Sequence, residues 1–141
     1  MTRCLKFELL WRDVDILSIR ISASNGNFSA AAHVYEGTGG AAELATQFQS
    51  FPASSHDTRD FMVGSFGRDS AGGSVRMRLF SEGGAVRAFI ELWFESDYQE
   101  SGRDESAHFF SAVEPGAIDT FVAQLQQIER GEGDGAELLL V

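Results

Sequence analysis

The stretch from Val75 to Phe94 constrains the fold most, because it predicts both a β-hairpin and the register of that hairpin. Gly83-Gly84 supplies the positive φ that a two-residue hairpin turn requires. A turn there pairs apolar residues on one face: Val75 with Leu92, Met77 with Ile90 and Leu79 with Ala88. The other face pairs Arg76 with Glu91, Arg78 with Phe89 and Phe80 with Arg87, with Trp93 beyond them. Opposite charges and cation–aromatic pairs therefore support the same alignment.

A second hairpin is predicted between residues 15–23 and 28–35, because Asn25-Gly26 suits a type I′ turn. This turn would give four apolar pairs: Ala23 with Phe28, Ile21 with Ala30, Ile19 with Ala32 and Leu17 with Val34. The reverse face would be more polar, pairing Ser22 with Ser29, Arg20 with Ala31, Ser18 with His33 and Ile16 with Tyr35. That face suits solvent or a partner.

The other elements follow from hydrophobic periodicity. Period-two alternation predicts strands over residues 5–12, 59–66 and 106–113, the first with Leu5, Phe7, Leu9 and Trp11 on one face. Helical spacing predicts a short helix over 41–51, stopped by Pro52, and a longer helix over 116–130. The apolar stripe of the longer helix is Ile118, Phe121, Val122, Leu125 and Ile128. Such a stripe must cover the apolar face of a sheet.

Together these elements predict one α+β domain over residues 1–141. We expect a curved antiparallel sheet of about six to seven strands, with the C-terminal helix and the short internal helix packed on one face. Both hairpins would turn their apolar sides toward the 116–130 helix. Residues 131–135 should be flexible, whereas 138–141 are strongly apolar. This tail either adds a strand to its own sheet, which we favour, or docks on a second protomer.

Composition narrows the class of partner. The 141 residues are 43% hydrophobic, enough for one core without metal or disulfide support, and Cys4 is the only cysteine. A reducing compartment fits best, and the absence of a signal-like start or a long apolar run predicts a cytoplasmic protein. The formal net charge of −10 disfavours nucleic acid and membrane surfaces as partners. The same charge would speed encounter with a basic protein.

No catalytic, metal or cofactor site is predicted. The histidines are His33, His56 and His108, but no serine lies in the nucleophile-elbow motif that a catalytic triad of this kind would use. His56 and Asp57, with Asp60 nearby, could supply metal ligands, but no second cluster completes the coordination shell. The segment 97–108 imitates a calcium loop at two positions but lacks its bidentate glutamate. The glycine-rich segment 64–73 lacks the lysine and helix of a phosphate loop. We therefore expect a non-enzymatic protein without a cofactor.

The remaining candidate is a protein-binding surface on the polar face of the 75–94 hairpin. Tryptophan and arginine are the side chains that most often anchor protein interfaces. The candidate partner-binding residues are Arg76, Arg78, Phe80, Arg87, Phe89, Glu91 and Trp93. The alternative is that loops, the N-terminal strand or a second sheet layer buries this face.

A resemblance adds a specific functional expectation. Its residues are Ser24-Asn25-Gly26-Asn27-Phe28, Tyr35, Leu44, Phe48, Phe51-Pro52, the hairpin 75–94, and Ile118, Phe121 and Leu125. In this pattern the chain resembles WapI-like bacterial immunity proteins, small cytoplasmic antitoxins that neutralise the toxic tips of contact-dependent polymorphic toxins. The acidic 97–105 loop and the apolar tail depart from it.

The resemblance implies a module that neutralises a cognate toxin, covering a basic active site with acidic and aromatic surface. Two alternatives stay open. One is a small-molecule-binding or enzymatic domain that uses a pocket between sheet and helices. The other is a structural homo-oligomer, such as a homodimer, joined through the C-terminal tail.

Overall fold

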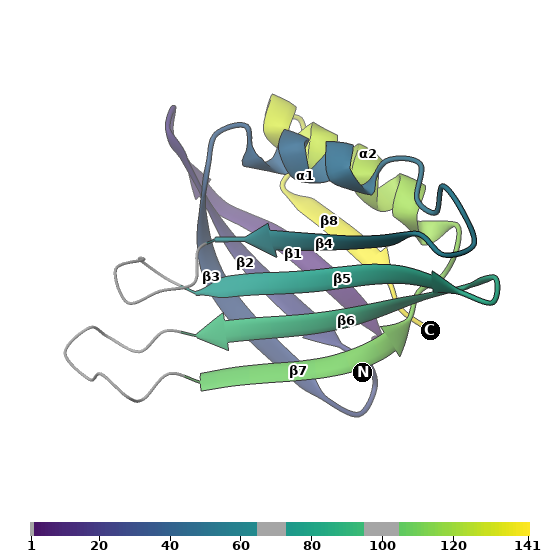
Figure 1. The fold of residues 1–141 in the computed structure, drawn as a ribbon. Helices are drawn as coiled ribbons and strands as arrows, with labels where there is room; N and C mark the ends of the chain where they lie inside the picture. The colour runs from purple at the N-terminus through teal and green to yellow at the C-terminus, as the bar shows by residue number, and fades with distance from the viewer. Residues whose placement is uncertain (1, 65–72, 95–104) are drawn as a thin grey trace.

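The computed structural model describes residues 2–64, 73–94 and 105–141 (Figure 1). Within these ranges the chain forms strands and helices in the order β1 (Cys4–Arg12), β2 (Ile16–Ser24), β3 (Ser29–Gly37), α1 (Gly40–Phe48), β4 (Thr58–Val63), β5 (Ser74–Glu82), β6 (Ala85–Phe94), β7 (Glu105–Ala112), α2 (Ala117–Arg130) and β8 (Gly135–Leu139). The predicted α+β class with antiparallel strands is confirmed.

The strands form two sheets rather than one curved sheet. One sheet has the order β3-β2-β1-β8 and the other the order β4-β5-β6-β7, with four strands in each (Figure 1). The expected sheet of six to seven strands was therefore wrong. The chain leaves the first sheet after β3, passes through α1, and begins the second sheet at β4. Each hairpin has one apolar face. Such a face can be buried against the apolar face of another sheet as well as against a helix.

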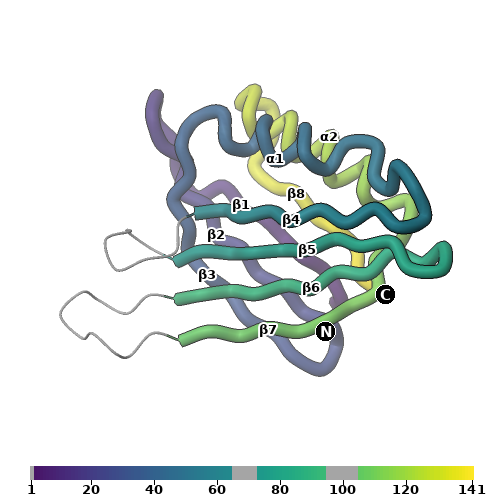
Figure 2. Tube along the Cα trace, viewed as in Figure 1, coloured from purple at the N-terminus to yellow at the C-terminus, as the bar shows by residue number. Residues whose placement is uncertain are grey.

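The helices close one side of the layered structure. α1 and α2 lie side by side and span from β8 of one sheet to β4 of the other (Figure 2). The expectation that both hairpins face α2 was wrong, because their apolar sides mainly face one another, with Met77 and Ile90 buried between the sheets. The α2 stripe is buried as predicted.

A cluster of four phenylalanines joins the helices to both sheets. Phe48 of α1 stacks on Phe61 of β4, with their ring centroids 3.9 Å apart. Phe121 of α2 contacts Phe48 and Phe7 of β1 edge-to-face, each at 5.4 Å. Edge-to-face and offset stacked rings are the favoured aromatic geometries. This cluster fixes α1 and α2 over the side of the two-sheet structure between β8 and β4.

The two hairpins differ in how well the sequence predicted them. The β5–β6 register matches every predicted pair, from Val75 with Leu92 to Phe80 with Arg87. In β2–β3 the partners are shifted by two residues, so that Ala23 pairs with Ala30 and Leu17 with Glu36. The physical reason is Asn25, whose Oδ1 accepts hydrogen bonds from the backbone N–H groups of residues 27 and 28. That side chain closes a four-residue loop in place of a two-residue turn.

Other element boundaries also moved. α1 ends at Phe48 instead of residue 51, although its buried positions are the predicted ones. β4 covers Thr58–Val63, and residues 65–66 of the predicted strand lie outside the described part of the chain. In β1 a register irregularity between Leu9 and Trp11 reverses the alternation. Trp11 is therefore exposed to solvent, contrary to the prediction.

The C-terminal segment completes the first sheet. β8 pairs with β1 in antiparallel register, with Leu138 opposite Leu5, and the backbone N–H of Leu140 donates to the carbonyl of Arg3. Leu138 is fully buried. The favoured prediction, pairing within the chain, is confirmed. An isolated bridge between Val113 and Leu140 connects the two sheets at this end.

Candidate functional site

The predicted partner-binding residues lie together on the outer face of the β4–β7 sheet, turned away from the other sheet. We call this surface the outer face. Its residues form cross-strand rows in the order β4, β5, β6, β7: Thr58, Phe80, Arg87, Ala112; Asp60, Arg78, Phe89, Phe110; and Met62, Arg76, Glu91, His108. Trp93 lies beyond them, opposite Ser106. The sequence therefore predicted the β5 and β6 half of the face.

The outer face exposes apolar side chains on its flanking strands. Phe110 of β7 is 62% exposed and Met62 of β4 is 54% exposed. Phe110 extends an aromatic cluster, because the Phe89 ring lies 5.1 Å from the Phe110 ring and 5.7 Å from that of His108. Among the described elements, neither helix nor the first sheet covers this face. Among the described residues, the N-terminal strand and a second sheet layer do not bury this face, although Phe80, Phe89, Glu91 and Trp93 are half-buried there.

Ion pairs hold the arginines of the outer face. Asp60 of β4 lies 3.2 Å from the Arg78 guanidinium and 3.7 Å from that of Arg76. Arg76 lies opposite Glu91 in register as predicted, but its ion pair is with Asp60. Arg87 lies 3.9 Å from Glu82. Exposed pairs of this kind add little stability, about 0 to 1 kcal/mol each, so their main effect is to orient the guanidinium groups.

The charge of the outer face is balanced. Its three arginines are matched by three carboxylates, Asp60, Glu82 and Glu91. The chain as a whole has 11 basic and 21 acidic residues, so the excess of ten negative charges belongs to the rest of the molecule. A neutral aromatic and arginine-rich face therefore lies on an acidic protein.

A second exposed patch was missed by the sequence reasoning. It lies around the β1–β2 turn and consists of Leu10, Trp11, Val14, Ile16 and Tyr35, and we call it the β1–β2 patch. Trp11 is 55% exposed because the β1 irregularity turns it outward, opposite Ser18. Ile16 and Tyr35 had been placed on the outward face of the second hairpin. Trp11 could have been assigned to the same patch only if the position of the β1 irregularity had been known, and no sequence motif marks it.

The histidines do not form a catalytic group with an acid among the described residues. Ser18 Oγ lies 2.5 Å from His33 Nε2, and the His33 ring lies 4.8 Å from the Tyr35 ring. No carboxylate hydrogen-bonds His33 in the described part of the chain, and Ser18 is buried. His108 belongs to the outer face, beside Phe89.

The weak metal cluster at residues 56–60 is not assembled. Asp57 accepts a hydrogen bond from the Ala53 N–H at 2.7 Å and pairs with Arg59 at 2.9 Å, whereas Asp60 faces the outer-face arginines. The Ala53 N–H, followed by Arg59, holds the pKa of the Asp57 carboxyl below its usual value. The described residues contain no group of three metal-ligating side chains. Residues 65–72 and residues 97–104 of the calcium-like segment lie outside the described residues.

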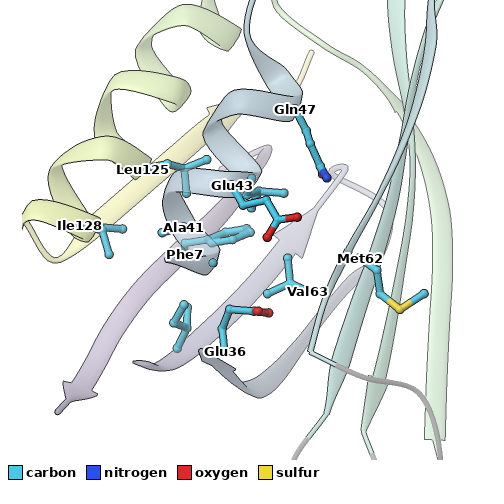
Figure 3. A pocket seen from close by; sticks show the side chains of 12 residues that line it. Phe7, Glu36, Ala41, Glu43, Gln47, Met62, Val63, Leu125 and Ile128 are labelled. Atoms are coloured by element: carbon cyan, nitrogen blue, oxygen red, sulfur yellow. The ribbon is translucent and has the colours of Figure 1, made fainter. Parts of the chain in front are cut away.

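A cavity of about 90 Å³ lies where α1 and α2 meet the two sheets. Its wall has both apolar and polar parts, and Glu36, Glu43 and Gln47 line it with their polar ends turned to the same side (Figure 3). Glu36 is held in place because its Oε2 accepts a 2.9 Å hydrogen bond from the Gly64 N–H. Its side chain also packs closely over Gly40, where any larger residue would collide with it. The location matches the predicted alternative of a sheet–helix pocket. The volume is well below the roughly 300 Å³ at which small-molecule and cofactor sites begin.

Comparison with known proteins gives no relative. No family model, curated protein or solved structure matches this chain. The resemblance to WapI-like immunity proteins therefore stays a prediction. Among the described helices, none has the length and apolar character needed to cross a membrane. The geometry of the outer face is the strongest functional observation.

Proposed function

We propose that this chain is a non-enzymatic protein-binding module whose partner docks on the outer face of the β4–β7 sheet. The observation that carries the proposal is the exposure of Phe110 and Met62 beside Arg76 and Arg78 on a sheet face that no described element covers. Aromatic, methionine and arginine side chains are enriched at the centres of protein interfaces. Arginines that are already oriented lose less conformational entropy on binding.

The charge distribution supports a basic partner. The outer face is neutral, while the surrounding molecule has a net charge of −10. A basic protein would be attracted by the long-range field, and the neutral face would avoid burying unpaired charges in the interface. Association should therefore be fast at low ionic strength and slow markedly as salt is added.

The role we propose for this module is neutralisation of a cognate polymorphic toxin. The support is the resemblance together with the charge arrangement, since many nucleic-acid-cutting toxins are basic. Neutralisation would occur by occlusion: the aromatic and arginine-rich outer face would cover the toxin, and the acidic surroundings would face its basic surface. This refines the predicted acidic and aromatic contact surface, because the acidic excess lies outside the outer face.

The test is a protection assay with the toxin domain encoded beside this gene. Cells expressing that toxin would also express the wild type, Phe110→Ala, Arg78→Ala or the matched control Trp11→Ala, which removes an aromatic residue of similar exposure from the β1–β2 patch. Purified proteins would be compared by calorimetry. Phe110→Ala and Arg78→Ala should each weaken binding about tenfold or more, as expected for interface anchors.

Two outcomes would contradict the proposal in different ways. Full protection by Phe110→Ala and Arg78→Ala, with loss in Trp11→Ala, would transfer the interface to the β1–β2 patch. A locus without any secreted toxin, together with no neutralising activity, would remove the toxin role.

A further inference from the structure

We propose that the cavity beside α1 receives one lysine side chain of the protein partner, with the aliphatic stem inside and the ammonium at the rim. This inference rests on the proposed function in one respect, namely that the lysine belongs to a protein partner. The partner chemistry is a primary ammonium on an unbranched chain. Free amines share that chemistry, so the test separates the two sources.

The size and lining of the cavity select an unbranched aliphatic chain. The apolar part of its wall is formed by Phe7, Ile19, Ala41, Leu44, Val63, Leu125 and Ile128. An apolar cavity of about 150 Å³ holds the six carbons of benzene, so by proportion the observed volume of about 90 Å³ holds about four carbon atoms. Aromatic rings and cofactors are too large for this space. Four methylenes are the length of a lysine stem.

The polar groups at the cavity select a cation with several donors. Glu36 comes from β3, and Glu43 and Gln47 come from α1, so that two carboxylates and one amide group line the same cavity (Figure 3). The exposed Glu43 carboxylate has no hydrogen bond or ion pair within the described part of the chain, and the Glu36 carboxylate pairs with no cation there, since its partner is the Gly64 N–H. An ammonium group has three donors and no acceptor, which matches these acceptors.

The cavity lies beside β4, the strand that borders the outer face. Met62 of β4 is exposed on the outer face and also lines the cavity. A partner docked on the outer face could therefore insert a lysine past the β4 edge without a second binding event. An aliphatic side chain entering an apolar cavity would act as the kind of anchor on which interfaces depend.

The experiment uses the full chain and no protein partner. Backbone amide NMR shifts of residues 40–47 would be followed during titration with ethyl-, propyl-, butyl- and hexylammonium at pH 7. Affinity should rise about fourfold for each methylene up to butylammonium and then stop rising, because the cavity is filled. Uncharged 1-butanol should bind at least tenfold more weakly than butylammonium.

Variants and a peptide-like probe complete the test. Glu43→Gln should weaken butylammonium binding several-fold, while the matched control Glu114→Gln, an exposed glutamate elsewhere, should leave it unchanged. Nα-acetyl-lysine N-methylamide should shift the same amides, and its norleucine counterpart should bind at least tenfold more weakly.

Three results would overturn the proposal. They are equal binding of 1-butanol and butylammonium, equal effects of Glu43→Gln and Glu114→Gln, or binding of butylammonium with exclusion of the peptide-flanked lysine. The last result would assign the cavity to a free amine. None of them depends on the outer face, so failure here is distinguishable from failure of the proposed function.

Discussion

Replacing Phe48 with alanine tests whether the phenylalanine cluster holds the helices against both sheets. Phe48 is fully buried, stacks on Phe61 at 3.9 Å and contacts Phe121 edge-to-face at 5.4 Å. Substitution of a buried phenylalanine by alanine typically costs about 3 to 5 kcal/mol, and the cost grows with the void that remains. Phe48 already borders a void of about 10 Å³, so the new cavity would merge with it.

We therefore expect Phe48→Ala to lower the free energy of unfolding by about 4 kcal/mol. Phe48→Leu, which keeps most of the volume, should lower it by less than about 1.5 kcal/mol. The control Phe110→Ala removes an exposed ring and should stay within about 0.5 kcal/mol of the wild type. Urea unfolding followed by circular dichroism would give all three values, with the m-value checked for constancy.

A double-mutant cycle isolates the stacked pair. Phe48→Ala and Phe61→Ala together should show a coupling of about 0.5 to 1.5 kcal/mol, since the rings contact one another. The view that this cluster holds the helices against both sheets would be refuted if Phe48→Ala lowered the free energy of unfolding by less than about 1.5 kcal/mol. It would also be refuted if the effects of the two single substitutions were additive.

Three further predictions concern the Asn25 loop, Asp57 and Cys4. Asn25→Ala removes acceptors for two backbone N–H groups and a donor to the Phe110 carbonyl, so it should cost about 1 to 2 kcal/mol in urea unfolding. Asn25→Asp keeps the acceptors and should cost less. Because the pKa of Asp57 is lowered, its stabilisation is present above about pH 4 and lost as the pH falls. Asp57→Asn should therefore lose less stability than the wild type between about pH 4 and pH 2, and an equally steep loss would contradict this. Burial, then Glu137, raises the pKa of the Cys4 thiol above its ordinary value of 9.0, so its alkylation rate should still be increasing above pH 9. A rate that levels off by pH 8 would be inconsistent with that environment.

Local patterns predicted local structure well. The Gly83-Gly84 turn needs no long-range information, because positive φ at both glycines sets the register and the side-chain pairs on both faces agree with it. The α2 stripe was equally readable, since one helical period defines its buried side. The β5–β6 hairpin contains all seven residues of the predicted site, and the hairpin and α2 together contribute much of the core.

Features that depend on tertiary contacts were not readable. An apolar strand face buries equally well against a helix or a second sheet, so the pattern of β2–β3 and β5–β6 could not reveal two sheets. The β2–β3 register was set by the Asn25 side chain rather than by the turn dipeptide. Trp11 faces outward because of one irregularity in β1, and the Met62 and Phe110 flanks of the outer face required knowledge of which strands border β5 and β6.

Hydroxyl-radical footprinting of the chain, free and bound to the proposed toxin partner, tests the central claim most directly, because methionine and aromatic side chains report their own exposure. In the free chain Met62, Phe110 and Trp11 should all react, since each is more than half exposed. In the complex the account predicts protection of Met62 and Phe110 and unchanged reactivity of Trp11. Protection of Trp11 with full reactivity of Met62 and Phe110 would contradict it.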